Sequence, residues 1–491
     1  MTFLHQVQGK KTGAGQSARR LFGWAVLLVE QVAFLLLTVC GRIQRHERGD
    51  NINCELFPSS EYLIDELSRY PDVTSSFAWA WRFGQNGYPS SELNTMLSLA
   101  EAQAAILTRT QPSTRTEVLV LARAHNRYAA SALHAGVDNP AFDNSAMDGY
   151  ALRRADLAAP GFLLSVAGES SCGSTPQTLT PGTAMRIFTG APLPAGADTV
   201  VMQEDVVHEG GQTRFPADAK PGQHVRRRGE DFRAGELLYE PGRRLSAYDL
   251  ALLSTAGVAQ VEVVARPRVL VVATGDELVA PGQALKPGQI YESNRLSTLL
   301  QLEALGAEAV DGGTVRDDPA ALRALLKGAS DYDFIITSGG ASVGDHDLVK
   351  QVFAEIGEIS FWKAKVKPGK PVAFGRLGER AHFFALPGNP VSSLVTFKLF
   401  VEPALYAWHH SKTPALELPA IAVNRFQRKP GRMEFLRARL YSENGELKAE
   451  CLKGQGSHML GTMRHTNGFI RLDEDSTGFE PGARITVLPL F

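Results

Sequence analysis

Five acidic side chains stand beside turn-forming residues, where loops could bring them to a bound ligand. They are Asp148 in DNSAMDGYA, Asp231 in RRRGED, Glu277 in ATGDE, Asp317 in VRDDP and Asp347 in SVGDHD. A single acidic loop residue is usually a helix cap or a solvated charge. Glu277 and Asp347 fit that explanation least, because each follows an apolar, strand-like run by a few residues, where ligands of α/β sheets bind. Carboxylates that converge on one phosphorylated ligand would supply the hard oxygen atoms that Mg²⁺ prefers.

A glycine-rich turn, SGGASVGD, runs from Ser338 to Asp345. Gly339 and Gly340 have no Cβ, so their backbone N–H groups can approach an anion closely, and Ser338 and Ser342 add hydroxyl groups. Glycines also serve ordinary tight turns, and the pattern alone does not decide between the two. We predict an anion-binding turn.

Two further loops are stiffened by proline. WKAKVKPGKP, from Trp362 to Pro371, gathers four lysines that could trap an oxyanion, although a solvated basic loop has the same composition. LPGNP, from Leu386 to Pro390, has a fixed backbone whose free groups could face a ligand, or it is only a turn before a helix over 391–400. The lysines are Lys363, Lys365, Lys367 and Lys370, and the prolines of the second loop are Pro387 and Pro390.

The residues between these loops predict an α/β unit over 266–410. The unbroken apolar run from Arg268 to Thr274 indicates a strand that is buried on both faces. A helix follows, with Leu296, Leu299 and Leu300 on one face and Gly306 as its stop.

A second helix and strand complete the pattern. Asp318 is placed as the N-cap and Pro319 as the first helical residue, and the strand from Asp333 to Thr337 leads into the glycine-rich turn. Strand, helix, helix, strand and glycine loop form a βαβ arrangement with ligands at the carboxyl ends of the strands.

The flanking regions have other patterns. Apolar residues at helical spacing between Leu97 and Ala135 predict one or two helices, and short β-rich runs with Gly/Pro turns over 143–225 predict a small β domain. Alternation after about residue 415, as in Phe435, Arg437, Arg439 and Tyr441, predicts a C-terminal β domain.

Charge and cysteine usage limit the class of protein. The 51 basic and 52 acidic side chains leave a formal net charge of −1, so we expect no nucleic-acid partner and no general attraction to anionic membranes. The four cysteines lie far apart without CxxC or Cys/His pairing, which argues against a disulfide framework and a zinc site and favours the cytoplasm.

The amino-terminal segment stands apart. Leu21 to Cys40 is almost long enough to span a bilayer, but Glu30 and Gln31 lie at its centre and arginines follow on its far side. We therefore do not expect a membrane span. Residues 1–90 are interpreted as an N-terminal extension, either added by a misplaced start or, as the alternative, an anchor.

Eight segments together resemble the molybdopterin molybdenumtransferase family, which includes MoeA and the gephyrin E domain. The likeness runs from about Ser91 to Phe491, and the segments occur in the family's order and spacing. They are DNSAMDGYA, FTGAPLPAGADTVVMQED, RRRGED, ATGDEL, IYESNR, SGGASVGDHD, KPGKPVAFG and LPGNPVSS. So many ordered segments are far more specific than any single motif.

The resemblance implies a multidomain α/β and β protein. Its expected parts are a linker domain of 91–142 and 226–265, an inserted β domain of 143–225, a central doubly wound α/β molybdopterin-binding domain of 266–412, and a β-barrel-like domain of 413–491. It also implies a homodimer whose cleft joins the central domain of one subunit to the inserted domain of the other, so that Asp148 would come from the partner chain.

The resemblance also implies residue roles. Asp148, Asp231, Glu277, Asp317 and Asp347 match the family's functional carboxylates. Mg²⁺ would be held by Glu277, Asp317 and Asp347. Substrate or anion binding is expected from Thr189, Thr274, Ser338, Gly339, Gly340, Ser342, Lys363, Lys367, Lys370, Pro387 and Pro390.

The implied reaction inserts molybdate into adenylylated molybdopterin and releases AMP, with a separate molybdopterin adenylyltransferase supplying the substrate. One alternative is that adenylyltransferase activity itself, although its loop typically reads GGTG where this chain has GGAS. The other is a gephyrin-like scaffold without catalysis, which should have lost the carboxylates that this chain retains.

Overall fold

The computed structural model describes residues 96–158, 162–329, 331–339, 348–378, 380–411 and 416–490. The N-terminal extension, with its apolar segment 21–40, lies outside these residues, as do Gly340, Ser342 and Asp347. Within the described ranges, no helix is both long enough and apolar enough to cross a membrane.

A six-stranded sheet forms the middle of the α/β domain, in the order β16-β13-β17-β21-β20-β18. The first four strands are parallel, and β20 and β18 join the sheet antiparallel. The predicted run at 268–274 is β13, which confirms the buried strand. The strands are β13 Arg268–Thr274, β16 Glu308–Val315, β17 Phe334–Ser338, β18 Gly357–Lys363, β20 Pro371–Leu377 and β21 Ala381–Leu386.

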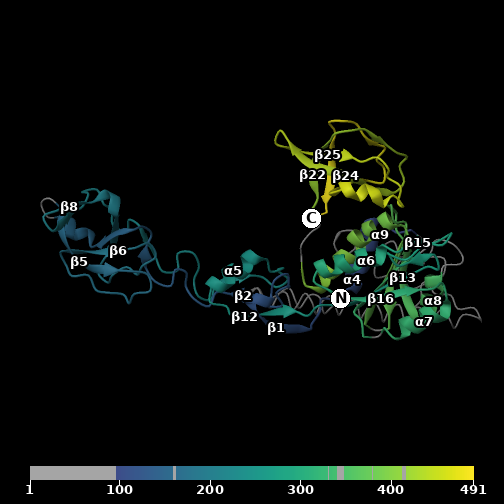
Figure 1. Cartoon of the computed structure of the whole chain (residues 1–491), viewed down its shortest axis with the longest axis horizontal. Coiled ribbons are helices and arrows are strands. Elements are labelled where there is room, and N and C mark those ends of the chain that lie inside the picture. Colours follow the sequence, from purple (N-terminus) through teal and green to yellow (C-terminus); the bar gives the residue numbers. More distant parts are fainter. Residues whose placement is uncertain are drawn as a thin grey trace, which may run out of the picture. The chain divides into compact units, whose positions relative to one another are not determined.

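Helices cover both faces of this sheet because successive strand residues point to opposite sides. Val269 and Val271 pack in one core with α4, α6, α9 and α10, whereas Leu270 and Val272 pack in another with α7 and α8 (Figure 1). The helices are α4 Leu99–Arg109, α6 Asn294–Ala304, α7 Pro319–Lys327, α8 Leu348–Ile356, α9 Pro390–Thr396, the π-helical turn η4 Phe397–Val401 and α10 Glu402–Trp408.

Local signals at the start of α7 are confirmed, whereas two of the three leucines that share one face of α6 are exposed. The Asp318 side chain accepts a hydrogen bond from the Ala320 N–H at 2.9 Å, with Pro319 as the first helical residue. In α6, Leu296 and Leu300 are 58% and 57% exposed, and Thr298 and Leu302 are buried instead. Both faces of α6 carry apolar residues, and contact with the sheet selects one of them.

The helical prediction for Leu97 to Ala135 holds only for its first part. After α4 the chain forms β1, Thr116–Val120, which pairs antiparallel with β12, Gln260–Val264. β-Branched residues in this segment favour a strand once a partner strand is available. Buried residues of α4, Ala102 and Ile106, belong to the core of the α/β domain.

The linker and inserted domains are built from short elements. The linker adds helix α5, Ala247–Thr255, and the inserted domain contains a six-stranded sheet in the order β7-β4-β6-β5-β9-β8. The remaining elements are η1 Leu121–Arg123, β2 Leu133–His134, β3 Asn144–Ser145, β4 Gly149–Leu152, η2 Arg154–Ala158, β5 Leu163–Ser170, β6 Thr183–Ile187, β7 Thr199–Met202, η3 Gln203–Asp205, β8 Val207–Glu209, β9 Gln212–Arg214, β10 Val225–Arg226 and β11 Leu237–Tyr239.

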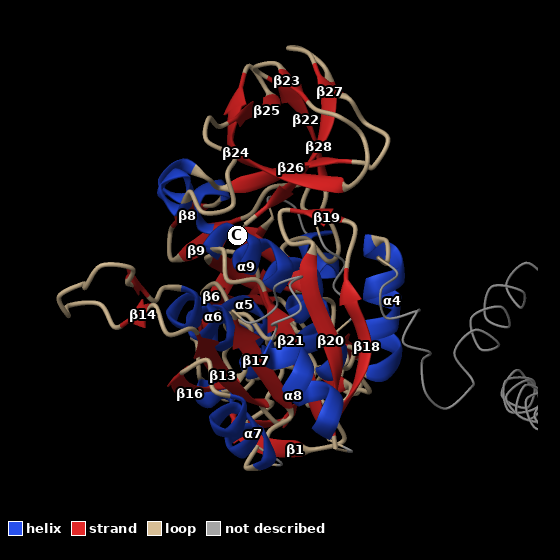
Figure 2. Ribbon diagram, turned by 90° about the vertical axis from the view of Figure 1, so that its right-hand side faces the viewer, coloured by secondary structure: helices blue, strands red, loops and turns tan. Residues whose placement is uncertain are grey.

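The C-terminal domain is a closed barrel, because β24 pairs with both β25 and β26 (Figure 2). β19, Val366–Lys367, belongs to the lysine loop and pairs with β24, which joins this barrel to the α/β domain. The multidomain α/β and β prediction is therefore confirmed. The remaining elements are β14 Leu278–Val279, β15 Ile290–Tyr291, β22 Leu418–Ala422, β23 Phe426–Gln427, β24 Met433–Glu443, β25 Glu446–Cys451, η5 Leu460–His465, β26 Gly468–Leu472, β27 Gly478–Phe479 and β28 Arg484–Pro489.

A buried carboxylate fixes the beginning of the central strands. Asp333 has no exposed side-chain surface, and its oxygens pair with Arg380 at 2.9 Å and with Arg115. The backbone N–H of Arg268 donates to it at 2.9 Å. Asp333 thus connects the starts of β13 and β17.

We predict that Asp333→Ala lowers the free energy of unfolding by about 3 kcal/mol, because the change leaves two arginines and a backbone N–H without their acceptor. Urea unfolding followed by tryptophan fluorescence tests this, since Trp362 and Trp408 lie in the same domain. Asp331→Ala, at an exposed neighbour, is the matched control. Equal unfolding midpoints for the two variants would contradict the prediction.

Candidate active site

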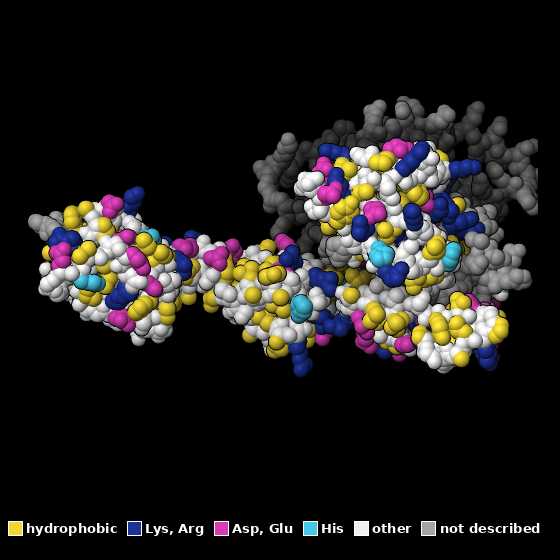
Figure 3. Space-filling view, turned by 45° about the horizontal axis from the view of Figure 1, so that its top comes forward, with side chains coloured by type: hydrophobic (Ala, Val, Ile, Leu, Met, Phe, Trp, Pro, Cys, Tyr) yellow, Lys and Arg dark blue, Asp and Glu magenta, His cyan; other side chains and the backbone are white. Residues whose placement is uncertain are grey.

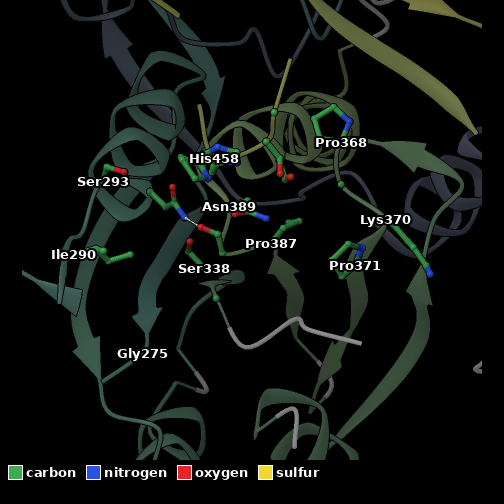
Figure 4. Close-up of a pocket in the computed structure, with 18 of the residues that line it drawn as sticks. Gly275, Ile290, Ser293, Ser338, Pro368, Lys370, Pro371, Pro387, Asn389 and His458 are labelled. Carbon is green, nitrogen blue, oxygen red and sulfur yellow. Dashed lines mark hydrogen bonds between the residues drawn. The ribbon is translucent and has the colours of Figure 1, made fainter. Parts of the chain in front are cut away.

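A cavity of about 1140 Å³ opens at the carboxyl ends of the parallel strands (Figure 4). Loops after parallel strands end at one edge of the sheet, which is why segments distant in sequence meet here. The C-terminal barrel supplies the remaining wall, through Arg432, Glu434 and the segment 455–458. The predicted residues that line this cavity are Thr274, Glu277, Asp317, Ser338, Gly339, Lys367, Lys370, Pro387 and Pro390.

Carboxylates form one side of the cavity, after β13 and β16. A Cβ at Gly275 would lie 2.5 Å from Oε2 of Glu277, so the glycine makes room for this carboxylate. The Asp276 carboxylate accepts a long hydrogen bond from the Asp317 N–H at 3.4 Å. This bond joins the segments that follow β13 and β16, which carry Glu277 and Asp317 at the same edge of the sheet.

These carboxylates provide the kind of ligand that magnesium binds. Glu277 and Asp317 both line the cavity, and carboxylate oxygens are suitable donors for Mg²⁺ together with phosphate oxygens. Asp347, the third predicted ligand, lies outside the described residues. Among the residues that are described, no cluster of three or more His, Cys, Asp or Glu side chains could hold a metal ion. The two carboxylates fit a metal that a phosphorylated substrate helps to bind.

The beginning of the glycine-rich turn lies between two strand ends. Gly339 has φ +91°, and a Cβ there would come 2.5 Å from the backbone oxygen of Thr274. The buried Thr274 hydroxyl has no hydrogen-bond partner among the described residues. Gly339 is therefore required for the close approach of the two strand ends, and the Thr274 hydroxyl beside it is a buried polar atom.

The proline loop is held from both sides. The Asn294 side chain, at the start of α6, donates from Nδ2 to the Gly388 carbonyl at 2.8 Å. The backbone N–H of Val391 donates to the Ser457 carbonyl at 3.0 Å, which connects the loop to the C-terminal domain. Pro390 is the first residue of α9. The Asn294 side chain of α6 and the Ser457 backbone carbonyl of the C-terminal domain thus fix the position of the loop.

The two lysines that line the cavity differ in their partners. Nζ of Lys367 lies 2.8 Å from Oε1 of Glu434, whose side chain is only 3% exposed. Lys370 forms no salt bridge within the described part of the chain. Its side chain points away from Pro387 and Asn389 (Figure 4). Lys363 lies at the end of β18 and does not line the cavity.

The segment from the barrel is fixed by a buried arginine. Arg437 is 1% exposed and donates from Nη2 to the carbonyls of Gly454 at 2.7 Å and Gly456 at 3.1 Å. Burial lowers the pKa of its guanidinium below the usual value. Arg437 thereby supports the turn that brings Ser457 and His458 to the cavity.

Asp148, Thr189 and Asp231 do not line this cavity. In the inserted domain, Oδ1 of Asp148 accepts hydrogen bonds from the Thr189 N–H at 2.7 Å and hydroxyl at 2.9 Å. These two bonds, the backbone one first, lower the pKa of Asp148 below its usual value. Asp231 accepts from Asn139 Nδ2 at 2.8 Å. The prediction that Asp148 serves the site of a partner subunit stays a prediction.

Several lining residues were missed by the sequence interpretation. Glu292 and Asn294 belong to the IYESNR segment, which was noted without a role for either residue. Glu434, Ser457 and His458 had no local signal, because they reach the cavity only through the packing of the barrel on the α/β domain.

Fold and site together define a multidomain α/β and β protein whose main cavity, at the carboxyl ends of the parallel strands, is lined by carboxylates and lysines. Three family profiles match the chain in order: "MoeA N-terminal region (domain I and II)" over residues 97–257, "Probable molybdopterin binding domain" over 270–407 and "MoeA C-terminal region (domain IV)" over 419–490.

Individual relatives agree with these profiles. Molybdopterin molybdenumtransferase of Haemophilus influenzae is 41% identical, over 80% of this chain and 98% of that protein. Molybdopterin molybdenumtransferase 2 of Mycobacterium tuberculosis is 36% identical, over 80% and 97%. The molybdopterin biosynthesis moeA protein of Pyrococcus horikoshii has a TM-score of 0.71 at 29% identity, over 80% of this chain and all of that one. This chain belongs to the molybdopterin molybdenumtransferase (MoeA) family, enzymes of molybdenum cofactor biosynthesis.

We predict that Asn294→Ala loosens the proline loop, because it removes a hydrogen bond worth about 1 kcal/mol. Hydrogen–deuterium exchange of peptides covering 386–390 should rise several-fold, whereas exchange in β21 stays the same. Gln301→Ala is the control, since that side chain bonds the Ser297 carbonyl within the same helix. The role assigned to Asn294 fails if both variants exchange like the wild type.

We also predict that Thr189→Val raises the pKa of Asp148 part of the way to its usual value, because the hydroxyl donor is lost and the backbone donor remains. A lowered pKa in the folded state means that this contribution to stability is present above the unfolded-state pKa and is lost as the pH falls through the lowered one. Carbon-13 NMR titration of aspartate carboxyls measures the change. Thr183→Val is the control, since its hydroxyl donates to a carbonyl; an equal pKa in both variants would contradict the account.

Proposed function

We propose that this enzyme inserts molybdate into adenylylated molybdopterin and releases AMP in a magnesium-dependent reaction. The observation that carries the proposal is one cavity with carboxylates on one side and lysines on another, Glu277 and Asp317 with Lys367 and Lys370. The relatives from Haemophilus influenzae and Mycobacterium tuberculosis are molybdopterin molybdenumtransferases, which supports the same chemistry.

The division of charge suits two anionic substrates. Molybdate is a dianion, and the phosphoanhydride that joins pterin to AMP is also negative, so the two repel each other. The formal net charge of the chain is −1 and gives no general attraction, so local groups must neutralise both. A volume of about 1140 Å³ suits a ligand of dinucleotide size.

Glu277, Asp317 and Asp347 would hold the magnesium ion, which would offset the negative charge of the phosphoanhydride. Lys367 and Lys370, with backbone donors of the loops, would bind molybdate. Glu434 keeps the Lys367 ammonium at the cavity wall, and Asn294 keeps the proline loop in position. These residues contribute positioning and charge neutralisation.

A covalent enzyme intermediate has no support in the described residues. Cys451 does not line the cavity, and burial raises the pKa of its thiol to about 11, so it stays protonated at neutral pH. Cys172 lies in the inserted domain, where its thiol donates to the Thr189 carbonyl. Direct transfer between bound substrates therefore agrees best with this site.

The same proposal includes a homodimer in the cytoplasm, supplied by a separate molybdopterin adenylyltransferase. Asp148 forms the exposed end of a small hydrogen-bonded cluster with Thr189, and neither residue lines the cavity that they are expected to serve. A cleft completed by the partner subunit would explain both facts.

The experiment uses the full chain with adenylylated molybdopterin, molybdate and Mg²⁺, and follows AMP release beside cofactor formation. Glu277→Gln and Asp317→Asn should each lower both rates about a hundredfold, because a neutral side chain no longer stabilises the metal and the developing charge. Asp331→Asn, an equal charge change at an exposed loop, should keep the wild-type rates.

Equal AMP release by the wild type and both cavity variants would overturn the site assignment. Adenylylation of molybdopterin by ATP would favour the adenylyltransferase alternative. If the folded chain reacts neither with adenylylated molybdopterin and molybdate nor with molybdopterin and ATP, the result would favour a scaffold without catalysis.

A further inference from the structure

One segment of the inserted domain holds the turn of Asp148 at two points. The segment is β6 with the residues that follow it, and it supplies both Arg186 and Thr189. Thr189 donates to the Asp148 side chain through its N–H at 2.7 Å and its hydroxyl at 2.9 Å. Arg186 binds the backbone directly after Asp148, because its Nη1 donates to the Gly149 carbonyl at 3.1 Å. The carboxylate and the neighbouring backbone are thus fixed by the same segment.

A second contact of Arg186 closes a small network around Asp148. Nη2 of Arg186 donates to Oε1 of Gln203. The backbone N–H of Gln203 donates in turn to the Asp148 carbonyl at 3.1 Å. The planar guanidinium therefore connects the residue after Asp148 with the residue that binds the Asp148 carbonyl. A lysine has one compact ammonium on a flexible chain and cannot hold both acceptors in this fork-shaped geometry.

The Arg186 side chain is itself held by aromatic rings. Arg186 and Tyr150 lie opposite each other on the antiparallel strands β6 and β4, so their side chains share one face of the sheet. The guanidinium carbon lies 5.1 Å from the ring centre of Tyr150 and 5.1 Å from that of Phe188. Tyr150 belongs to a buried core of the inserted domain. Cation–π contacts with two rings therefore restrict where the guanidinium can lie.

The backbone on both sides of Asp148 is also restricted. A Cβ at Gly149 would lie 2.0 Å from the Val201 carbonyl oxygen, so β4 and β7 approach closely directly after Asp148. Before Asp148, the Ser145 hydroxyl donates to the Met147 carbonyl at 2.5 Å. Asp148 is exposed at the end of this framework. A rigid support under an exposed carboxylate suits a side chain that must meet a group outside its own domain.

A general attraction for anions does not explain Arg186. On the lobe that Figure 1 labels β5, β6 and β8, Figure 3 shows acidic side chains among the basic ones. After the two hydrogen bonds from Thr189, the positive charge of Arg186 also lowers the pKa of Asp148. The charge of Arg186 thus acts on a carboxylate of its own domain, and its specific contacts indicate its role.

We propose that Arg186 is a positioning residue, which fixes the turn of Asp148 so that the inserted domain presents this carboxylate to the cavity of the partner subunit. This inference rests on the proposed function, in which the cleft joins two subunits. The contacts of the guanidinium lie within its own domain, at Gly149, Gln203 and the two rings. Loss of Arg186 should therefore misplace the carboxylate and leave molybdate binding by the lysine loop unchanged.

The first test measures AMP release by Arg186→Lys, with Arg214→Lys as the matched control. Arg214 lies in the same domain and pairs with Glu209 at 2.5 Å on the β8–β9 hairpin. For Arg186→Lys, the rate at saturating substrates should fall roughly tenfold, because a misplaced carboxylate supports the reaction only part of the time. The molybdate concentration for half-maximal release should not change. Arg214→Lys should keep both wild-type values.

A double variant tests whether the bridge through Gln203 carries the effect. Gln203→Ala removes one acceptor of Arg186 and leaves the guanidinium and both rings in place, so it keeps the test decisive even if Arg186→Lys unfolds the domain. Gln203→Ala should lower the rate in the same way. The double variant should be no slower than the slower single variant, because both changes break one bridge. Independent, multiplied losses would contradict the bridge.

Mixed dimers test which subunit Arg186 serves. Two chains with different affinity tags are co-expressed and purified as mixed dimers, with Asp148→Asn against Glu277→Gln as the reference pair. One of the two clefts is then intact, so the reference pair should regain about half of the wild-type rate. Arg186→Lys should likewise regain about half when paired with Glu277→Gln. Paired with Asp148→Asn it should regain nothing, because every cleft then contains one altered inserted domain.

These outcomes separate the inference from the proposed function. If the reference pair regains activity and Arg186→Lys behaves like Arg214→Lys, the positioning role is wrong and the shared cleft stands. Recovery of Arg186→Lys by Asp148→Asn would also overturn the role, because Arg186 would then serve the cavity of its own subunit. If the reference pair regains nothing, the shared cleft is wrong and the role of Arg186 falls with it.

Discussion

A lysine of the α/β domain and a buried glutamate of the C-terminal barrel form the contact on which the cavity depends. Lys367 and Glu434 lie at a junction that is also a β ladder, since β19 pairs with β24 at this point. The ladder fixes the distance between the two domains, and the ion pair fixes the side chain at their boundary. A buried carboxylate needs such a partner, because an unpaired charge is costly away from water. The two domains are thus joined where the lysine loop lines the cavity.

The rest of the site follows from how closely backbone segments approach one another. Gly339 lies against the end of β13, and Gly369 lies against Thr396 of α9, at positions where a Cβ would collide. Asn294 and Ser457 then hold the proline loop between α6 and the barrel. These contacts place loops from four strands around one volume. An enzyme that acts through positioning and charge neutralisation needs this rigidity more than it needs a reactive side chain.

Positive and negative side chains are separated around the site, although the formal net charge of the whole chain is only −1. Carboxylates follow β13 and β16, and basic side chains lie along the lysine loop and the β23–β24 turn. Such a division suits substrates that repel each other.

Short-range features of this protein could be predicted from the sequence by itself. The β13 strand, the Asp318 cap of α7 and the glycine and proline loops depend on neighbours within a few residues. The eight family segments indicated the fold class and contain most of the residues that line the cavity. Only the tertiary structure decided which apolar face of α6 is buried, that 116–120 is a strand, and that Glu434, Ser457 and His458 reach the cavity. The physical reason is that burial, strand pairing and ion pairing depend on partners far away in the chain, and local periodicity carries no information about those partners.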